Sequence, residues 1–354
     1  MNIGVTGCAG FIGSHLVDAL VHRGHRVVGI DNLSMGSMEN LEQVITHPGF
    51  TFHNVDVRDR DAVRECFSEA QAIVHLAAFK IPRYGKAIDT LVINNLGMHH
   101  VLETAAGTGA KVVFASTSDV YGKNPVVPFG EESDLVLGPS TVARWSYAVS
   151  KLYDEHLAFA FQDEYGIPVV GLRFFGSYGP RQHLSWWGGP QSVFISQLLK
   201  GEEITIHGDG RQTRSFTYVS DTVEGVVAAV ERPEADGQLS NIGSTEEITI
   251  LDLARLIHRL CGCDGAGPRL RFVPYAAISG KRYEDVRRRV PDNGKLRSLL
   301  GVSPRVGLTE GLERTIRWQR AAMERAPQAG GAPAGVSQAS ISQAGALLRP
   351  EARV

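Results

Sequence analysis

Short apolar runs alternate with amphipathic stretches through the first half of the chain. The runs predict buried strands because they are brief and rich in valine and isoleucine. They cover residues 2–6, 26–30, 51–55, 72–76 and 112–115. The segments between them place apolar residues at helical spacing. Regular alternation of strands and helices is typical of the α/β class, with a parallel, doubly wound sheet that binds ligands at the carboxyl ends of its strands.

The pattern becomes less regular after a further strand at residues 169–173. Residues 176–190 are rich in glycine and contain Trp186 and Trp187, which predicts a long surface loop or lid. Beyond this loop, helices are expected at 193–200, 221–231, 250–260 and 308–324, and strands at 204–207 and 270–273. We therefore predict a first domain at residues 1–172 and a smaller α/β part at 173–325 that closes over the sheet edge. Residues 326–354 are rich in Ala, Gly, Pro, Ser and Gln, which predicts a disordered tail.

The composition is that of an ordinary globular protein, with 43% hydrophobic and 21% charged residues. A formal net charge of -2 gives no electrostatic case for binding nucleic acid or an anionic membrane. The four cysteines are too few for a disulfide framework and lack metal-ligand spacing with histidines, so no metal site is predicted. The chain starts directly with an apolar strand and has no apolar span of ~20 residues, which favours a cytoplasmic location.

A glycine-rich turn follows the first strand, with the spacing Gly7-x-x-Gly10-x-x-Gly13, and a helix follows the turn. The second strand then ends at Asp31. A strand, a glycine turn, a helix, a second strand and an acid form the context of a dinucleotide site of the Rossmann type. The turn lets a pyrophosphate approach the backbone at the helix N-terminus. Asp31 is placed to accept hydrogen bonds from the adenosine ribose, and a carboxylate there favours NAD over NADP.

Candidate catalytic side chains gather between residues 112 and 151. The strand at 112–115 leads into Thr117, Ser118 and Asp119, and the predicted helix at 144–165 carries Tyr147 and Lys151. Residues four apart on a helix share one face, so the Lys151 ammonium can stabilise a Tyr147 phenolate. Tyr147 then becomes a usable base near neutral pH.

These motifs together resemble the extended short-chain dehydrogenases/reductases that act on nucleotide sugars, over about residues 1–322. The resemblance implies that NAD takes a hydride from C4 of the hexose, that Tyr147 removes the hydroxyl proton, and that Thr117 completes the catalytic set. It also implies a homodimer that pairs through a four-helix bundle, for which the apolar faces near 98–102 and 152–161 are suited. The expected cofactor-binding residues are Gly7, Gly10, Phe11, Ile12, Gly13, Asp31, Asn32, Asp56, Val57, Leu76, Ala77, Ala78, Asn94, Tyr147 and Lys151.

The residues after Thr117 distinguish activities within this family. A 4,6-dehydratase uses an Asp-Glu pair there, which Ser118 and Asp119 do not match, and a 4-epimerase leaves Asp119 unexplained. Residues 117–121 are similar to the Thr-Ser-Glu-Val-Tyr of UDP-glucuronate decarboxylases. We therefore expect oxidative decarboxylation of UDP-glucuronate to UDP-xylose or its 4-keto form. The alternatives are a nucleotide-sugar 4-epimerase, then a 4,6-dehydratase, and last a non-catalytic NAD-sensing protein.

The resemblance also assigns the substrate site. Arg289 matches an arginine near the substrate carboxylate and joins Thr117, Ser118, Asp119, Tyr147 and Lys151 in the expected catalytic set. The expected substrate-binding residues are Arg83, Tyr84, Arg181, His207, Arg214, Tyr283 and Arg289. Two departures stand out, because Gly176 replaces a usual asparagine and Asp119 is one carbon shorter than glutamate.

Overall fold

The computed structural model describes residues 1–80, 86–263, 267–279 and 284–325. A seven-stranded sheet forms its larger part, and every neighbouring pair of strands in it is parallel. In spatial order the strands are β3 (Phe50–His53), β2 (Arg26–Ile30), β1 (Asn2–Thr6), β4 (Ala72–His75), β5 (Lys111–Thr117), β6 (Val169–Phe174) and β11 (Gln238–Ile242). The order reverses between β1 and β4, so the doubly wound parallel sheet is confirmed.

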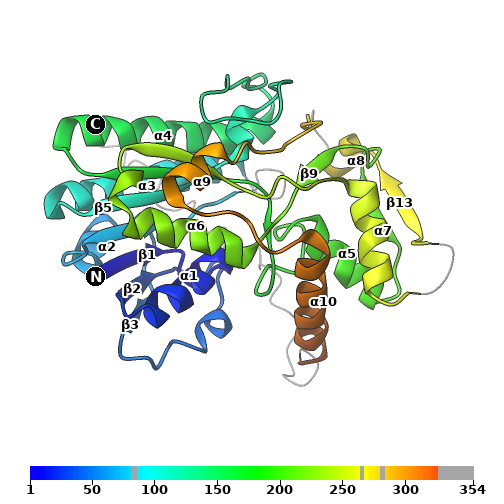
Figure 1. The fold of residues 1–354 in the computed structure, drawn as a ribbon, viewed down its shortest axis with the longest axis horizontal. Coiled ribbons are helices and arrows are strands. Elements are labelled where there is room, and N and C mark those ends of the chain that lie inside the picture. The colour runs from blue at the N-terminus through cyan, green and yellow to red at the C-terminus, as the bar shows by residue number, and fades with distance from the viewer. Residues whose placement is uncertain (81–85, 264–266, 280–283, 326–354) are drawn as a thin grey trace, which may run out of the picture.

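Helices cover both faces of this sheet (Figure 1). One face carries α1 (Phe11–His22) and α6 (Val219–Glu231), which share a hydrophobic cluster with β1. The other carries α2 (Arg60–Cys66), α3 (Ala87–Thr108) and α4 (Ser146–Tyr165). The helices α3 and α4 pack side by side along most of their length. In such a sheet, a helix that follows a strand starts near the carboxyl end of that strand. Because α3 follows β4 and α4 follows β5, their amino ends lie where the site is expected.

The smaller C-terminal part has its own short strands and helices, as predicted. Its main elements are α5 (Pro190–Leu199), β8 (Ile204–His207), α7 (Ile250–Leu260), β13 (Leu270–Val273), α8 (Tyr275–Ser279) and α10 (Leu308–Arg325). The strands β8 and β13 pair in parallel. Two further small pairs are β7 (Ser177–Tyr178) with β10 (Thr217–Tyr218) and β9 (Thr213–Ser215) with β12 (Glu247–Thr249). Short 3-10 turns at Met38–Leu41, Ser118–Tyr121 (η2), Ala143–Trp145 (η3) and Pro233–Ala235 complete the described structure, with α9 (Gly294–Leu300).

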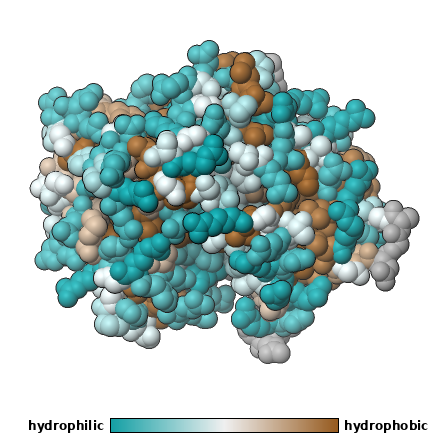
Figure 2. All heavy atoms as spheres, in the orientation of Figure 1, coloured by the Kyte–Doolittle hydropathy of each residue, from teal (hydrophilic) through white to brown (hydrophobic). Residues whose placement is uncertain are grey.

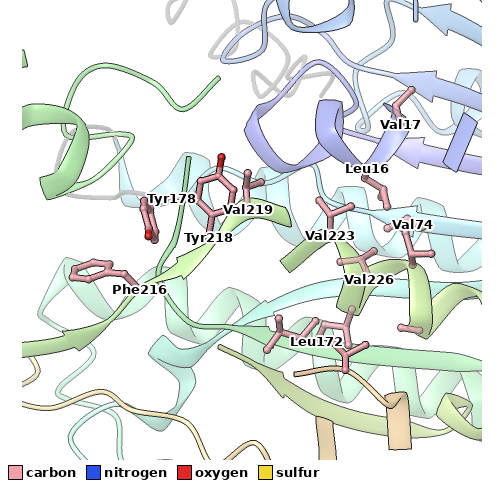
Figure 3. Packing of buried hydrophobic residues seen from close by; sticks show 14 of the residues in the cluster. Leu16, Val17, Val74, Leu172, Tyr178, Phe216, Tyr218, Val219, Val223 and Val226 are labelled. Carbon is pink, nitrogen blue, oxygen red and sulfur yellow. The ribbon is translucent and has the colours of Figure 1, made fainter. Parts of the chain in front are cut away.

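The chain returns to the large sheet after residue 172. The strand β11 pairs with β6, and α6 packs on the same sheet, so residues beyond the first predicted domain complete its fold. Figure 3 shows how this joins the two parts: Val223 and Val226 of α6 lie between Leu16 of α1 and Leu172 of β6. The same hydrophobic cluster continues to Tyr178, Phe216 and Tyr218. One continuous core therefore supports both walls of the site.

The surface is mixed in character. On the face shown in Figure 2, hydrophobic residues appear in small groups among hydrophilic ones. Among the described residues, no helix combines the length and the apolar character needed to cross a membrane.

Candidate active site

A cavity of about 1630 Å³ opens at the carboxyl ends of the strands, between the sheet and the C-terminal part. It is bordered by the turns after β1, β2, β4 and β5 on one side and by residues of β8 and β9 on the other. Small-molecule sites commonly measure about 300–1,000 Å³. This cavity is larger than that range.

The glycine turn after β1 forms a tight cradle in this cavity. Gly7 has φ +69, a conformation that favours glycine. A Cβ on Gly13 would overlap the carbonyl oxygen of Gly7, whereas a Cβ on Gly10 would meet that oxygen only at 3.1 Å. Gly10, Phe11, Ile12 and Gly13 all line the cavity at the start of α1. This backbone has the shape and the helix N-terminus that a dinucleotide pyrophosphate requires.

Two carboxylates lie beside the cradle. Asp31 is buried, and its two oxygens accept hydrogen bonds from the backbone amides of Ala9 (3.0 Å) and Leu33 (2.8 Å). Burial raises the pKa of Asp31 despite these bonds. Each oxygen keeps a lone pair for a ribose hydroxyl, so the structure fits the predicted role.

Asp56 is engaged differently. It forms hydrogen bonds with the backbone and guanidinium of Arg58 and with the amide of Asn32 (2.8 Å). Burial opposes these contacts, but together they lower the pKa of Asp56 to about 2. Asn32, Asp56, Val57, Leu76, Ala77 and Ala78 all line the cavity. An adenine amino group at Asp56 would have to share the carboxylate with Arg58.

The predicted catalytic side chains meet where β5 and α4 approach each other. Thr117 ends β5 and accepts a hydrogen bond from the Asp119 amide at 3.2 Å, which starts the turn η2. Thr117, Ser118, Asp119, Tyr147 and Lys151 all line the cavity. Burial, followed by the charges of Asp119 and Asp154, raises the pKa of Tyr147, while a hydrogen bond with Thr117 and the charge of Arg289 oppose this rise. The predicted hydroxyl, phenol and amine therefore all lie in the cavity wall. The expectation that Tyr147 is a base near neutral pH is not met, because its surroundings raise its pKa above the ordinary value.

Asn94 lies behind this group rather than in the cavity wall. Its side-chain oxygen accepts from the amide of Phe79 at 2.7 Å, and its nitrogen donates to the hydroxyl of Ser150 at 3.0 Å. It thus ties the segment after β4 to α4. Asn94 is fully buried, which fits a supporting role in the site.

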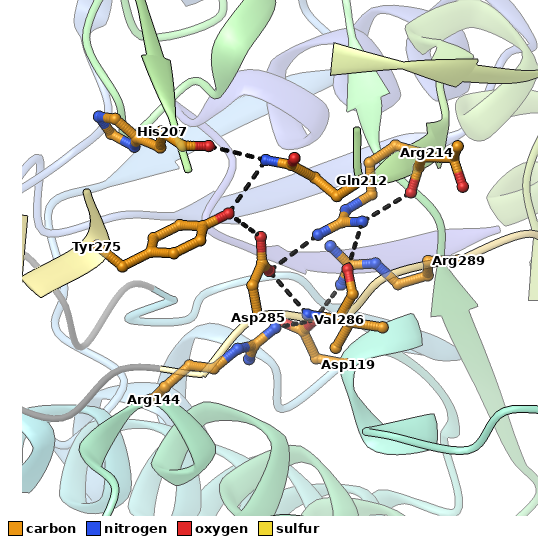
Figure 4. Close-up of polar contacts among 10 residues, drawn as sticks. Asp119, Arg144, His207, Gln212, Arg214, Tyr275, Asp285, Val286 and Arg289 are labelled. Atoms are coloured by element: carbon orange, nitrogen blue, oxygen red, sulfur yellow. Dashed lines mark hydrogen bonds and ion pairs between the residues drawn. The ribbon is translucent and has the colours of Figure 1, made fainter. Parts of the chain in front are cut away.

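A cluster of arginines and carboxylates forms the far wall of the cavity (Figure 4). Asp119 lies between Arg144, at 3.2 Å, and Arg289, with which it also forms an ion pair. Burial alone would raise the pKa of Asp119, but Arg289 and Arg144 hold it well below its usual range. Asp119 is therefore a carboxylate at neutral pH.

The cluster continues toward the C-terminal part. Arg214 forms an ion pair with Asp285 at 2.9 Å and donates to the carbonyl oxygen of Val286 at 2.8 Å. Tyr275 donates to the other oxygen of Asp285 at 2.5 Å. The cluster contains three arginines and two carboxylates, so it carries one net positive charge. A cavity wall with this excess can bind an anionic group.

The other end of this wall is aromatic. The rings of Trp186 and His207 are stacked with centroids 3.9 Å apart and an interplanar angle of 24°, and both line the cavity. The carbonyl oxygen of His207 accepts from the Gln212 side chain at 3.0 Å. The predicted loop at 176–190 therefore packs against β8 through Trp186.

Other predicted substrate residues have mixed outcomes. Arg181 lines the cavity and forms an ion pair with Asp18 at 2.7 Å. Arg83, Tyr84 and Tyr283 lie outside the described residues. Gly176 has φ +48, and a Cβ there would lie 2.6 Å from the carbonyl oxygen of Ser215, so this close approach suits glycine.

Sequence reasoning missed several residues of the wall, namely Arg144, Gln212, Tyr275 and Asp285. One available signal was the position of Arg144 three residues before Tyr147, although the structure places Arg144 in the turn η3 and not in α4. Within the described part of the chain, no group of three or more His, Cys, Asp or Glu side chains could hold a metal ion.

Comparisons with known proteins agree with this geometry. The sequence profile of the family described as GDP-mannose 4,6 dehydratase matches residues 5–315. A UDP-N-acetyl-alpha-D-glucosaminuronate decarboxylase of Bacillus cytotoxicus is 36% identical over 318 residues, which cover 89% of this chain and 97% of that protein. The UDP-glucuronic acid decarboxylase 1 of Xenopus tropicalis is 38% identical, over 90% of this chain and 72% of that protein.

Solved structures show the same fold. A UDP-glucose 4-epimerase of Thermotoga maritima, with UDP-glucose, superposes with a TM-score of 0.81 at 32% identity and covers 91% of this chain and all of that chain. A UDP-glucuronic acid 4-epimerase of Bacillus cereus, in complex with UDP-glucuronic acid and NAD, gives 0.80 at 31% identity, with the same coverage.

Proposed function

Because the chain belongs to the GDP-mannose 4,6-dehydratase family of extended short-chain dehydrogenases/reductases, we propose that it is an NAD-dependent decarboxylase of a nucleotide-linked hexuronic acid. UDP-glucuronate is the expected substrate, and UDP-xylose or its 4-keto form is the expected product. The relatives named as decarboxylases support this choice, and the cradle at Gly7 to Gly13 fits the dinucleotide. NAD bound there supplies the hydride acceptor for oxidation at C4 and the hydride donor for any later reduction.

The observation that carries the proposal is the excess positive charge at the far wall of the cavity. Arg144 and Arg289 flank one carboxylate, that of Asp119, close to Tyr147 and Thr117. A neutral hexose would not require this charge, whereas a sugar with a carboxylate at C6 would be oriented by it. The position of this charge beside Tyr147 and Thr117, rather than the charge alone, supports a uronic acid, since the diphosphate of any nucleotide sugar is also anionic.

The residues of the chain divide the chemistry among them. Thr117 aligns the C4 oxygen, and Tyr147 takes the proton of the C4 hydroxyl as general base. The sugar is then a β-keto acid, which loses carbon dioxide because the electrons of the broken bond flow into the ketone as an enolate. Arg144 and Arg289 hold the carboxylate until that bond breaks.

Asp119 has a positioning role in this scheme. Its ionised state makes it a poor proton donor to C5, because Arg289 and Arg144 keep its pKa below its usual range. Its carboxylate fixes the two guanidinium groups instead. Ser118 is buried beside it and is the remaining predicted residue near C5.

The test is to incubate the purified protein with NAD and UDP-glucuronate and to follow carbon dioxide release and the mass of the nucleotide sugar. UDP-N-acetylglucosaminuronate and UDP-glucose are run in parallel, because relatives of this chain carry the corresponding names. Carbon dioxide release from a uronate, lost in Tyr147→Phe, supports the proposal. An unchanged mass with a new C4 epimer would show a 4-epimerase instead and would overturn it.

A further inference from the structure

A buried carboxylate that the proposed mechanism does not use lies next to Lys151. Asp154 is fully buried, and its Oδ2 is 3.2 Å from the Lys151 ammonium nitrogen. Its other oxygen, Oδ1, has no hydrogen-bond partner in the structure. A buried carboxylate with an unsatisfied oxygen is costly, so its presence calls for an explanation.

The position of Asp154 connects it to the catalytic base. Tyr147, Lys151 and Asp154 follow one another at intervals of four and three residues on α4, which places them along one face of the helix. Along this face of the helix, Lys151 comes between Tyr147 and Asp154. The ammonium is bonded to Asp154, and the charge of Asp154 is one of the causes that raise the pKa of Tyr147.

We infer that Asp154 is a positioning residue that holds the Lys151 ammonium and thereby limits how strongly this ammonium acidifies the Tyr147 phenol. The Asp154 carboxylate raises the pKa of the Tyr147 phenol in two ways. It anchors the cation on its own side, and its negative charge opposes formation of a phenolate. Asp154 therefore raises the pH at which Tyr147 becomes a base, and this role rests on the proposed function only in naming Tyr147 as that base.

The surrounding charges are few and can be named. On α4 itself, Lys151 and Glu155 act on Asp154, and Lys151 is also the charge that acts on buried His75 of β4. Glu155 is bound by Arg173 of β6. Two further charges act on Tyr147, that of Asp119 from η2 and that of Arg289 from the C-terminal part. From α3, the neutral side chain of Asn94 contacts α4 through Ser150.

Burial leaves Asp154 able to change its own charge. Burial raises its pKa to about 6, although Lys151 opposes this. The buried His75 is neutral near pH 7, because burial and the Lys151 charge lower its pKa to about 3. The charge of Asp154 can therefore vary in the neutral range.

The experiment titrates the Tyr147 phenol directly, without turnover. Phenolate absorbance is recorded against pH for the protein and for its Tyr147→Phe counterpart, and the difference reports Tyr147 alone. The same pair is measured in an Asp154→Asn background. The amide keeps the shape but removes the charge, so we expect the phenol pKa to fall by about one unit or more. The acid limb of kcat/KM, where substrate turnover is found, should move to lower pH by the same amount.

Controls separate this role from a structural one. Asp163→Asn makes the same substitution at an exposed position of α4 and should leave the phenol titration unchanged. Asp154→Glu keeps the charge and should keep the phenol pKa near that of the parent. A phenol pKa that is unchanged or higher in Asp154→Asn would overturn the inference, even if the variant is less stable.

The parent protein offers a test that needs no change at residue 154. With Asp154 holding Lys151, the Tyr147 phenol should titrate above the value of about 10 found for free tyrosine. A parent phenol that titrates below this value would contradict the inference. Because the titration requires no turnover, a protein that fails to release carbon dioxide would refute the proposed activity without affecting this result.

Discussion

Burying the Asp119 carboxylate costs free energy, but its charge balances two partly buried arginines. It is ion-paired with two arginines in a largely buried wall, so the exchange Asp119→Asn leaves two guanidinium groups without their carboxylate. We expect this variant to lose about 2 kcal/mol of unfolding free energy at pH 7. Urea denaturation measures the loss. Asp61→Asn is the control, because Asp61 also pairs with an arginine but is exposed, and exposed pairs contribute little.

The pH dependence of this difference follows from the sign of the shift. The pKa of Asp119 is depressed in the folded protein, so its stabilisation is present above the unfolded pKa of about 3.9 and is lost as the pH falls toward the folded value. The gap between the parent and Asp119→Asn should therefore be full at pH 7 and shrink below about pH 4. A gap that widens in acid would contradict the assignment of Asp119 as an ionised group.

Residues of the site were predictable where the chain itself places them together. Thr117 and Asp119 follow one strand, and Tyr147 and Lys151 share one helix, so local spacing was sufficient. The contact of Asp119 with Arg144 depends on how η2 and η3 approach each other, and that of Arg214 with Asp285 depends on segments far apart in sequence. Spacing along the chain carries no such information.

Strands and helices were predictable where the apolar pattern along the chain is regular. The strands at 204–207 and 270–273 and the helix at 250–260 have the predicted bounds, because their apolar periodicity is strong. The strand β11 was not predicted, since it contains Ser240 and Asn241 in its buried stretch. Asn241 is tolerated there because it accepts from Tyr121 at 2.7 Å and donates to the Phe129 carbonyl at 2.9 Å. Tertiary partners, which periodicity does not show, make this strand possible.

The turn between β1 and α1 yields a prediction at the scale of the element. A Cβ at Gly13 would overlap the Gly7 carbonyl oxygen, whereas a Cβ at Gly10 would lie 3.1 Å from that oxygen. Gly10 also lines the cavity. Gly13→Ala should therefore lower the melting temperature markedly. Gly10→Ala should stay folded but bind NAD at least about tenfold more weakly, because a methyl group obstructs the pyrophosphate. Calorimetric titration with NAD and thermal unfolding separate the two effects.

The control for this pair is Gly107→Ala, because a Cβ at this position of α3 meets nothing within 4 Å. It should leave NAD affinity unchanged and be neutral or slightly stabilising, since alanine is the better helix former. Equal affinities for NAD in the parent and in Gly10→Ala would show that the cofactor does not use this turn.

At the scale of the whole molecule, the site is built from distant parts of the chain on one shared core. The turn between β1 and α1 supplies the cradle and α4 carries Tyr147, while Arg214 and Arg289 come from the C-terminal half. The strand β11 and the helix α6 bind these halves together, because both come from that half and pack into the large sheet. The charged wall therefore depends on the same packing that completes the sheet.

The predicted homodimer concerns the outer face of α3 and α4. Leu96 of α3 is 42% exposed, and Val149 and Tyr153 of α4 are 44% and 48% exposed. These side chains lie on two helices that pack side by side, so a second copy related by two-fold symmetry could cover them and form the four-helix bundle. Burial of such apolar area would stabilise the pair by about 25 cal/mol per Å².

We therefore expect the parent protein to sediment with about twice the 38.4 kDa mass of the chain, and Leu96→Glu combined with Tyr153→Glu to sediment as a monomer. Each substitution places a carboxylate in the interface twice, once from each copy, and unpaired buried charges are costly. Phe272→Glu provides the control, because Phe272 of β13 is 52% exposed but lies outside α3 and α4, so its replacement should leave the dimer intact. Dissociation by Phe272→Glu and not by the paired exchange would move the interface to the C-terminal part, where β13 rather than the helix pair would carry the association.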